Sequence, residues 1–273
     1  MQNDFIDVII PVYNGGKLLL STLRCLENQT YNKARFIIVD NGSIDGSSDI
    51  IDDFLGSCTS KRWSLVRYPS PTGMTSDWNR AMNHCRAPLV KLLPCDDLLE
   101  TSCLENEIRL LKNYPEAGFT VAKKWLVNSH GEILKYPFSI PNGLLESKAW
   151  EKKLLSNPIN IWGEPGAVTI RRELLLETGL FDTSFSYYPD LDMWIRLLQK
   201  APALSWKGKE YFFRVHTASA TTGSAKRAAS EFARLNEKHL SLKWNKSLKC
   251  KYAWIKARFV GELRQMYMNL FKE

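Results

Sequence analysis

The chain has 273 residues, of which 44% are hydrophobic and 24% are charged, a balance typical of globular proteins and not of disordered or fibrous ones. No apolar run reaches the about 18 residues of a membrane-spanning helix. The first ten residues carry acids where a secretory signal carries lysine or arginine. We therefore expect a cytoplasmic protein that neither spans a membrane nor is exported by that route.

The formal net charge of +8 is confined to one end of the chain. Residues 1–223 hold 25 Lys and Arg against 25 Asp and Glu, whereas residues 224–273 hold 12 against 4. This shift in composition divides the chain into a neutral body, residues 1–222, and a basic extension, residues 223–273, where apolar residues recur at helical spacing. No nucleic-acid-binding motif accompanies the charge, so a nucleic-acid partner is not expected.

The first hundred residues alternate β-rich runs with segments of helical spacing. Four strands are predicted, at Phe5–Pro11, Arg35–Asp40, Ser64–Tyr68 and Leu89–Leu93. Repeated β-α-β units predict an α/β protein with a mostly parallel twisted sheet flanked by helices. Ligands of such sheets bind beyond the carboxyl ends of the strands. The candidate site residues therefore follow the first, second and fourth strands.

The second half is less regular. A helix is predicted from Ser102, which has capping-box spacing to Glu105. The further predicted elements are strands at Gly118–Ala122, Ile133–Phe138, Ala167–Ile170 and Tyr211–Val215, and helices at Arg172–Thr178 and Asp190–Lys200.

Acidic residues follow two of the predicted strands, and neither common glycine-rich phosphate loop is present. Asp96 and Asp97 come directly after the strand VKLL, where a divalent cation would relieve their repulsion. The alternative is a helix cap at Asp97 with Asp96 solvated. Asp40 ends the second strand, where it could accept hydrogen bonds from a nucleoside or form an Asx turn.

Several segments in a fixed order carry a family resemblance. PVYNGGKLLL through IIVDNGSIDGS, then GMTSDWNRA and VKLLPCDDLLE, resemble the nucleotide-binding half of the family 2 inverting glycosyltransferases of GT-A fold. The resemblance continues in EPGAVTIRRELLLETGLFD, YPDLDMWIRL and FFRVHTASAT, and so covers residues 5 to 222. It implies a nucleotide-binding half at residues 1–100 and an acceptor-binding half at residues 101–222.

The resemblance also implies roles for individual residues. Donor-nucleotide binding would fall to Pro11, Val12, Tyr13, Asn14, Asp40, Ser43, Gly73, Asn79 and Asp96. Asp97 and His216 would ligate Mn²⁺ or Mg²⁺, although a histidine after a strand is often only structural. Trp162 and Glu164 would contact the acceptor, and burial is the alternative for Trp162.

The resemblance assigns the general base to Asp190. This residue follows Pro189 at the start of a predicted helix, whose apolar face would anchor the helix and leave the carboxylate at a cavity edge. A helix N-cap is the alternative role, and Asp192 is the competing choice of base.

Together these features predict an enzyme that transfers one sugar, with inversion, from a nucleotide-diphosphate sugar to an acceptor hydroxyl. The expected donor is a UDP-sugar, and the expected acceptor is a glycan or a lipid-linked saccharide. The alternatives are a sugar nucleotidyltransferase and an inactive scaffold of the same fold. For the basic extension, the alternatives are peripheral contact with an anionic membrane and packing on the body.

Overall fold

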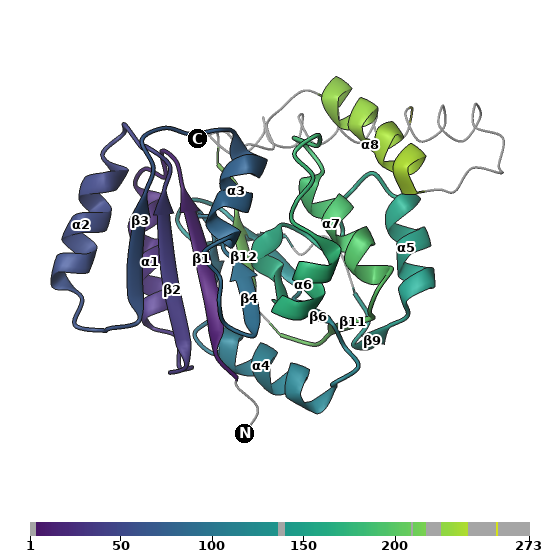
Figure 1. The fold of residues 1–273 in the computed structure, drawn as a ribbon, viewed down its shortest axis with the longest axis horizontal. Coiled ribbons are helices and arrows are strands. Elements are labelled where there is room, and N and C mark those ends of the chain that lie inside the picture. Colours follow the sequence, from purple (N-terminus) through teal and green to yellow (C-terminus); the bar gives the residue numbers. More distant parts are fainter. Residues whose placement is uncertain (1–3, 136–139, 209, 217–224, 240–254, 256–273) are drawn as a thin grey trace.

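The computed structural model describes residues 4–135, 140–208, 210–216, 225–239 and 255. A central eight-stranded sheet runs through the molecule in the order β3-β2-β1-β4-β10-β6-β11-β9 (Figure 1). Its strands are β1 (Ile6–Val12), β2 (Ala34–Asp40), β3 (Trp63–Arg67), β4 (Leu89–Leu92), β6 (Phe119–Val121), β9 (Gly143–Leu145), β10 (Val168–Arg171) and β11 (Ala203–Ser205).

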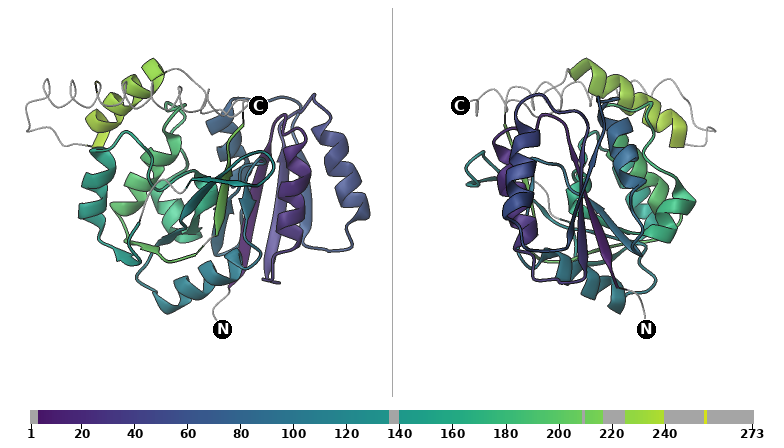
Figure 2. Two further views of the ribbon diagram at one scale, coloured as in Figure 1. Left: turned by 180° about the vertical axis from the view of Figure 1, so that it is seen from behind. Right: turned by 60° about the vertical axis from the view of Figure 1, so that its left-hand side comes forward.

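The first half of the sheet is parallel, as the sequence predicts. β1 pairs in parallel with β2 and β4, and β2 with β3. All seven residues of β1 are buried, because a parallel strand is covered on both faces and is apolar on both. The covering helices are α1 (Leu18–Glu27), α2 (Ser47–Ser57) and α3 (Met74–Met82), and Figure 2 shows helices on both faces of the sheet.

A second, four-stranded sheet joins the two halves of the chain. It has the order β5-β12-β7-β8, from β5 (Leu98–Leu99), β7 (Lys124–Val127), β8 (Ile133–Lys135) and β12 (Tyr211–Arg214). β12 pairs antiparallel with β5, with Tyr211 opposite Leu99. This pairing brings the residues just after β12 beside the acidic turn that precedes β5.

The remaining helices come from the part of the chain that follows β5. They are α4 (Cys103–Asn113), α5 (Ser147–Leu155), α6 (Arg172–Thr178), α7 (Pro189–Leu198) and α8 (Ala225–His239), with a 3₁₀ turn η1 at Pro165–Ala167. α8 begins inside the predicted basic extension, yet it packs on the body and buries Ala228, Ala229, Phe232 and Leu235. The rest of the extension, apart from Ile255, lies outside the described residues, and so does most of the predicted membrane contact.

Some local predictions need correction. The Ser102 side chain does not cap α4; it accepts a hydrogen bond from Asn106 Nδ2, and Glu105 accepts one from Thr30. A local partner on the same helix therefore takes Ser102, and a tertiary contact takes Glu105. No prediction covers β5, β7, β9, β11 or α5, and residues 136–139 of the expected strand Ile133–Phe138 lie outside the described part.

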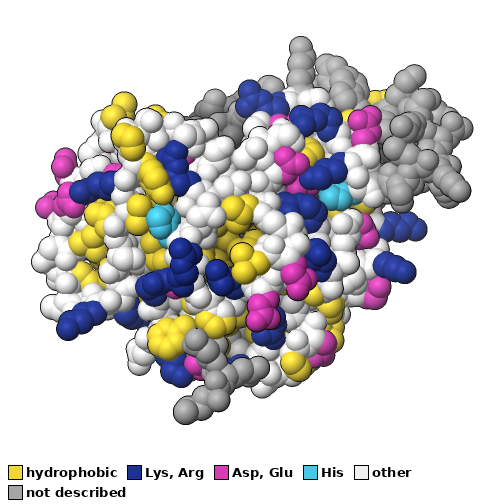
Figure 3. Space-filling model, viewed as in Figure 1, with side chains coloured by type: hydrophobic (Ala, Val, Ile, Leu, Met, Phe, Trp, Pro, Cys, Tyr) yellow, Lys and Arg dark blue, Asp and Glu magenta, His cyan; other side chains and the backbone are white. Residues whose placement is uncertain are grey.

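Among the described residues, no helix is long and apolar enough to cross a membrane. The surface in Figure 3 carries interspersed basic and acidic side chains. This pattern agrees with the even charge of residues 1–223.

Candidate active site

A cavity of about 530 Å³ lies at the carboxyl ends of β1 and β4, where the fold class places ligands. Ten of the residues singled out from the sequence line it: Pro11, Val12, Tyr13, Asn14, Gly73, Asp96, Asp97, Glu164, Asp190 and His216. They come from both halves of the chain. The fold therefore gathers most of the predicted site into one place.

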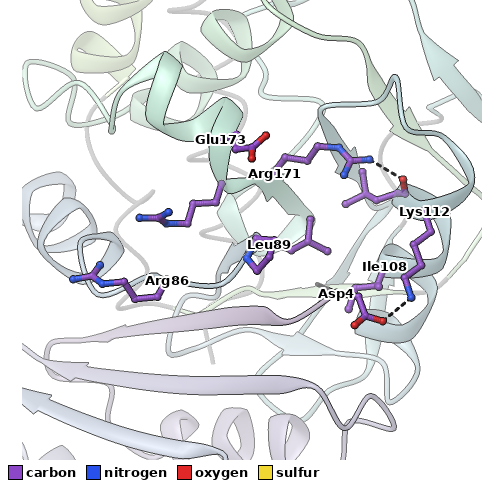
Figure 4. Close-up of a pocket in the computed structure, with 10 residues that line it drawn as sticks. Asp4, Arg86, Leu89, Ile108, Lys112, Arg171 and Glu173 are labelled. Carbon is purple, nitrogen blue, oxygen red and sulfur yellow. Dashed lines mark hydrogen bonds and ion pairs between the residues drawn. The ribbon is translucent and has the colours of Figure 1, made fainter. Parts of the chain in front are cut away.

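A second cavity, of about 360 Å³, lies at the opposite edge of the sheet (Figure 4). Its basic residues are partly engaged: Lys112 pairs with Asp4 at 2.6 Å, and Arg171 donates to the Leu111 carbonyl at 2.7 Å. It contains none of the residues that the sequence analysis assigned to the site. The cavity beyond β1 and β4 is therefore the candidate active site.

Two loops form the nucleotide-side wall and hold each other in place. Asn14 has a positive φ of 52°; its backbone N–H donates to Ser43 Oγ at 3.0 Å, and its side-chain oxygen accepts from the Ile44 N–H at 3.0 Å. The buried Asp40 carboxylate accepts from the Ser43 N–H and from Ser48 Oγ. Asp40 and Ser43 do not line the cavity; they fix the loop that supports Asn14.

The two acids of the turn after β4 have different environments. Asp97 is 1% exposed, and its two carboxylate oxygens accept from the Tyr211 hydroxyl and from the Arg214 N–H. Burial, and then the charge of Asp96, raise the pKa of Asp97 well above its usual range. The Asp96 side chain keeps 29% exposure, and its Oδ2 lies 2.9 Å from His216 Nε2. The carboxylate presented to the cavity beside His216 is therefore that of Asp96.

Arg214 on β12 connects the turn after β4 to α1 through hydrogen bonds. Its guanidinium donates to the Leu18 carbonyl at 3.0 Å, to Thr22 Oγ1 at 2.6 Å and to the Asp96 carbonyl. His216 follows two residues later, so the same anchor sets the position of the histidine beside Asp96.

Asp190 lies on the opposite wall, in the first turn of α7. Its Oδ2 accepts from Asn160 Nδ2 at 2.7 Å, and its Oδ1 accepts from the Leu191 N–H at 2.7 Å. Burial, and then the charge of Glu164, raise the pKa of Asp190 to about 7, although Lys124 opposes the shift. A carboxylate with a pKa near neutrality is suited to accept a proton.

Glu164 is held by an ion pair, with Lys124 Nζ 3.0 Å from its carboxylate. The Lys124 ammonium also lies 5.4 Å from the centre of the Phe213 ring. This pair places one further carboxylate in the cavity wall beside Asp190.

Asp192, the competing choice of base, is fully buried and already paired. It accepts from Arg196 Nε, Lys238 Nζ and His239 Nε2, each at 2.7 Å. Although burial opposes the change, these partners lower its pKa. Asp192 is also absent from the cavity lining, so its geometry fits a structural role.

Two further expectations change in the structure. Trp162 has no exposed surface and packs against the rings of Phe119 and Trp150. It cannot stack on a sugar in this conformation, so we withdraw it from the acceptor site. Asn79 does not line the cavity; it exchanges hydrogen bonds with the Phe181 backbone, which joins α3 to the loop before α7.

The sequence analysis missed several residues of the cavity wall. They include Asp77, Trp78, Asn160, Ser186, Tyr187 and Tyr188. Asn160 matters most, because it contacts Asp190 directly and also donates to the Gly163 carbonyl at 2.8 Å. A lone asparagine carries no signal in periodicity or spacing. Its position two residues before the segment WGEP is the only pointer to it.

Gly166 in η1 gives a first testable prediction. A Cβ at this position would lie 2.4 Å from the Tyr211 ring, whose hydroxyl holds Asp97. Replacing Gly166 by Ala should therefore cost about 1–3 kcal/mol in the free energy of unfolding, measured by urea denaturation. Gly56→Ala is the control, because nothing lies within 4 Å of that exposed helical position. Equal stability of the two variants would contradict this account of the packing.

The sheet order, the flanking helices and the cavity at the strand ends define a protein of the GT-A fold. The sequence profile of glycosyl transferase family 2 matches residues 7–162. The chain therefore belongs to this glycosyltransferase family, and the resemblance seen in its motifs is confirmed.

The chain is also similar to individual curated proteins. The uncharacterized protein MT1568 of Mycobacterium tuberculosis is 27% identical over 231 residues, which are 80% of this chain and 69% of that protein. The glycosyltransferase GlyG of Streptococcus pneumoniae is 26% identical over 104 residues, and that match spans 38% of this chain and only about a third (34%) of GlyG.

Two solved structures share the fold at low sequence identity. S. aureus TarS 1–349 in complex with UDP-GlcNAc has a TM-score of 0.69 and 14% identity, over 94% of this chain and 73% of that chain. The mannosyltransferase PcManGT of Pyrobaculum calidifontis, in complex with GDP-Man and Mn²⁺, has a TM-score of 0.65 and 17% identity, over 96% and 75%. These likenesses establish the fold.

Proposed function

We propose that this glycosyltransferase moves one sugar from a nucleoside-diphosphate sugar to an acceptor hydroxyl with inversion, and that Asp190 is the general base. The observation that carries the proposal is the position of Asp190. It is a buried carboxylate with a pKa of about 7, in the wall of the cavity that also holds Asp96 and His216. One cavity would thus hold both the proton acceptor and the diphosphate of the donor.

The proposed reaction is a single displacement. The Asp190 carboxylate takes the proton of the acceptor hydroxyl while that oxygen attacks the anomeric carbon from the face opposite the nucleotide. The new bond joins the acceptor oxygen to the anomeric carbon. The bond from that carbon to the phosphate oxygen breaks, and the nucleoside diphosphate leaves with the electron pair. The proton on Asp190 then passes to water.

A divalent cation fits the residues beside the diphosphate site. Among the described residues no three acidic, histidine or cysteine side chains form a complete metal site. Mg²⁺ and Mn²⁺ often take one or two protein ligands and complete their shell with substrate phosphates and water. Asp96 and His216 supply a carboxylate and an imidazole 2.9 Å apart. We assign the metal to this pair in place of the expected Asp97, and the bound cation would offset charge on the departing diphosphate.

The donor and acceptor remain proposals. We retain a UDP-sugar as the donor because TarS was solved with UDP-GlcNAc, whereas the GDP-Man complex of PcManGT makes guanosine the competing base. On the nucleotide side, Tyr13 is 45% exposed, which leaves its ring available to stack on a base. The acceptor is proposed to be a glycan or a lipid-linked saccharide.

The test measures binding and then turnover. Calorimetry with UDP, GDP and dTDP, each with and without Mn²⁺, should show metal-dependent binding of one diphosphate. The matching sugar nucleotide, UDP-GlcNAc or GDP-mannose for the first two, should then be hydrolysed slowly with water as acceptor, and NMR should show an inverted anomeric configuration. Release of pyrophosphate from a nucleoside triphosphate would instead indicate a nucleotidyltransferase. If none of the three diphosphates binds, the protein would be an inactive scaffold.

A further inference from the structure

The carboxylate of Glu231 on α8 lies behind the candidate active site and holds the loop that leads to Asp190. Glu231 is 5% exposed. Its two oxygens accept hydrogen bonds from the backbone N–H groups of residues 186, 187 and 188, at 2.7 to 3.2 Å, and from the Ser186 hydroxyl at 2.7 Å.

A buried carboxylate is costly unless hydrogen bonds compensate for the loss of water. Here the compensation comes from three consecutive N–H groups and one hydroxyl, so the loop cannot move away from α8 without leaving the charge unsatisfied. The loop therefore has one strongly preferred position relative to α8.

This loop is part of the active site. Ser186, Tyr187 and Tyr188 all line the cavity, and Tyr188 is the residue that precedes α7. Asp190 follows it by two residues, in the first turn. The Tyr188 hydroxyl also donates to the Pro158 carbonyl at 2.6 Å, in the segment that carries Asn160, the hydrogen-bond partner of Asp190. The loop is thus linked to Asp190 both through the chain and through space.

α8 contacts α7 at a second point, beyond Asp190. Lys238 Nζ and His239 Nε2 each lie 2.7 Å from Asp192 Oδ1. Contacts from α8 therefore reach α7 on both sides of Asp190, at residues 186–188 and at residue 192. Between them, the apolar residues Phe232 and Leu235 of α8 are fully buried.

We propose that Glu231 is a positioning residue for sugar transfer: by fixing residues 186–188 it sets where the Asp190 carboxylate lies in the cavity, and α8 is thereby a working part of the active site. This inference rests on the proposed function, in which Asp190 is the base. A displacement of about 1 Å in a catalytic group can reduce the rate by up to about a hundredfold.

The test replaces Glu231 by Gln, which keeps the size of the side chain and removes its charge. The assay is hydrolysis of UDP-GlcNAc, or of GDP-mannose if GDP is the diphosphate that binds. We expect kcat to fall about tenfold to a hundredfold, and KM for the donor to stay close to the wild-type value. Leu235→Ala is the matched control. It removes buried apolar surface from the same helix and keeps the Glu231 carboxylate that binds the loop, so it should lower the unfolding midpoint and leave kcat near the wild-type value.

The pH dependence of kcat gives a readout that lost stability alone would not change. Glu164, Lys124, Asn160 and the Leu191 N–H are the groups that act on Asp190, and Glu231→Gln alters none of them. A displaced loop would admit water to Asp190 and reduce its desolvation, so the acid limb of the profile should move to lower pH. In Leu235→Ala that limb should stay in place.

The outcomes separate this inference from the proposed function. Wild-type activity in Asp190→Asn would remove the base and this inference with it. Suppose instead that Asp190→Asn is inactive. If Glu231→Gln then keeps a wild-type kcat and pH profile, or loses only as much activity as Leu235→Ala, the inference about Glu231 fails and the proposed function stands. Should Glu231→Gln not fold, Ser186→Ala replaces it. That variant removes one donor and should lower kcat by a smaller factor, and an unchanged kcat would overturn the inference.

Discussion

Replacing Asp190 by Asn is expected to reduce kcat by about 10²- to 10⁴-fold, the usual contribution of a general base, while affinity for the nucleoside diphosphate stays the same. Asn has nearly the same shape and can still accept from the Leu191 N–H, but it cannot take a proton from the acceptor. Steady-state hydrolysis of the sugar nucleotide and calorimetry of the diphosphate measure the two quantities separately.

The wild-type pH profile belongs to the same prediction. With a pKa of about 7, Asp190 is protonated and inactive below that value, so kcat should rise with pH through about 7 and then level off. Stability should change in the opposite direction. The folded state keeps a proton that the unfolded carboxyl loses near its ordinary value, so this group's contribution to stability decreases from about pH 4 to about pH 7. Asp190→Asn should abolish both effects.

Asp192→Asn serves as the comparison for the base. Since Asp192 is buried among Arg196, Lys238 and His239, its loss should lower the unfolding midpoint and reduce kcat far less than the loss of Asp190. The reverse result, an active Asp190→Asn and an inactive Asp192→Asn, would transfer the role of base to Asp192.

The first half of the fold could be predicted because its local and global signals agree. Buried parallel strands are apolar on both faces, so Ile6–Val12 and Ala34–Asp40 stand out as runs in the sequence and appear within one residue of their predicted bounds. The second half contains short strands such as Gly143–Leu145 and Ala203–Ser205. Three residues are too few to show a period, and their pairing is set by the sheet that they join.

The sequence indicates which residues gather at the cavity, but it does not indicate how each side chain is held there. Strand ends locate Asp96 and Asp97 at one edge of the sheet, the family resemblance adds Asp190, and the structure brings all three to one cavity. Which carboxylate faces the cavity depends on Tyr211 and Arg214, more than a hundred residues along the chain. The role of α8 depends in the same way on Glu231 meeting the loop at residues 186–188. Contacts at such separation leave no pattern in a single sequence.

The two acids after β4 should therefore respond differently to the same substitution. Asp96→Asn is expected to raise the dissociation constant of the nucleoside diphosphate in Mn²⁺ by tenfold or more, towards its metal-free value, because an amide is a weaker ligand than a carboxylate. The unfolding midpoint should change little, since the Asp96 side chain is 29% exposed. Calorimetry with and without Mn²⁺ measures the first quantity, and thermal unfolding measures the second.

Asp97→Asn is the matched control, one residue further along the same turn. Its carboxylate is buried and accepts from Tyr211 and from the Arg214 N–H, so the substitution should cost about 1–3 kcal/mol of stability. The folded variant should keep its Mn²⁺-dependent affinity.

His216→Ala should reproduce the binding loss of Asp96→Asn, because both side chains are assigned to the same ion. If Asp97→Asn instead lost the metal dependence while Asp96→Asn and His216→Ala kept it, the cation would belong to Asp97, and the assignment drawn from the geometry would be wrong.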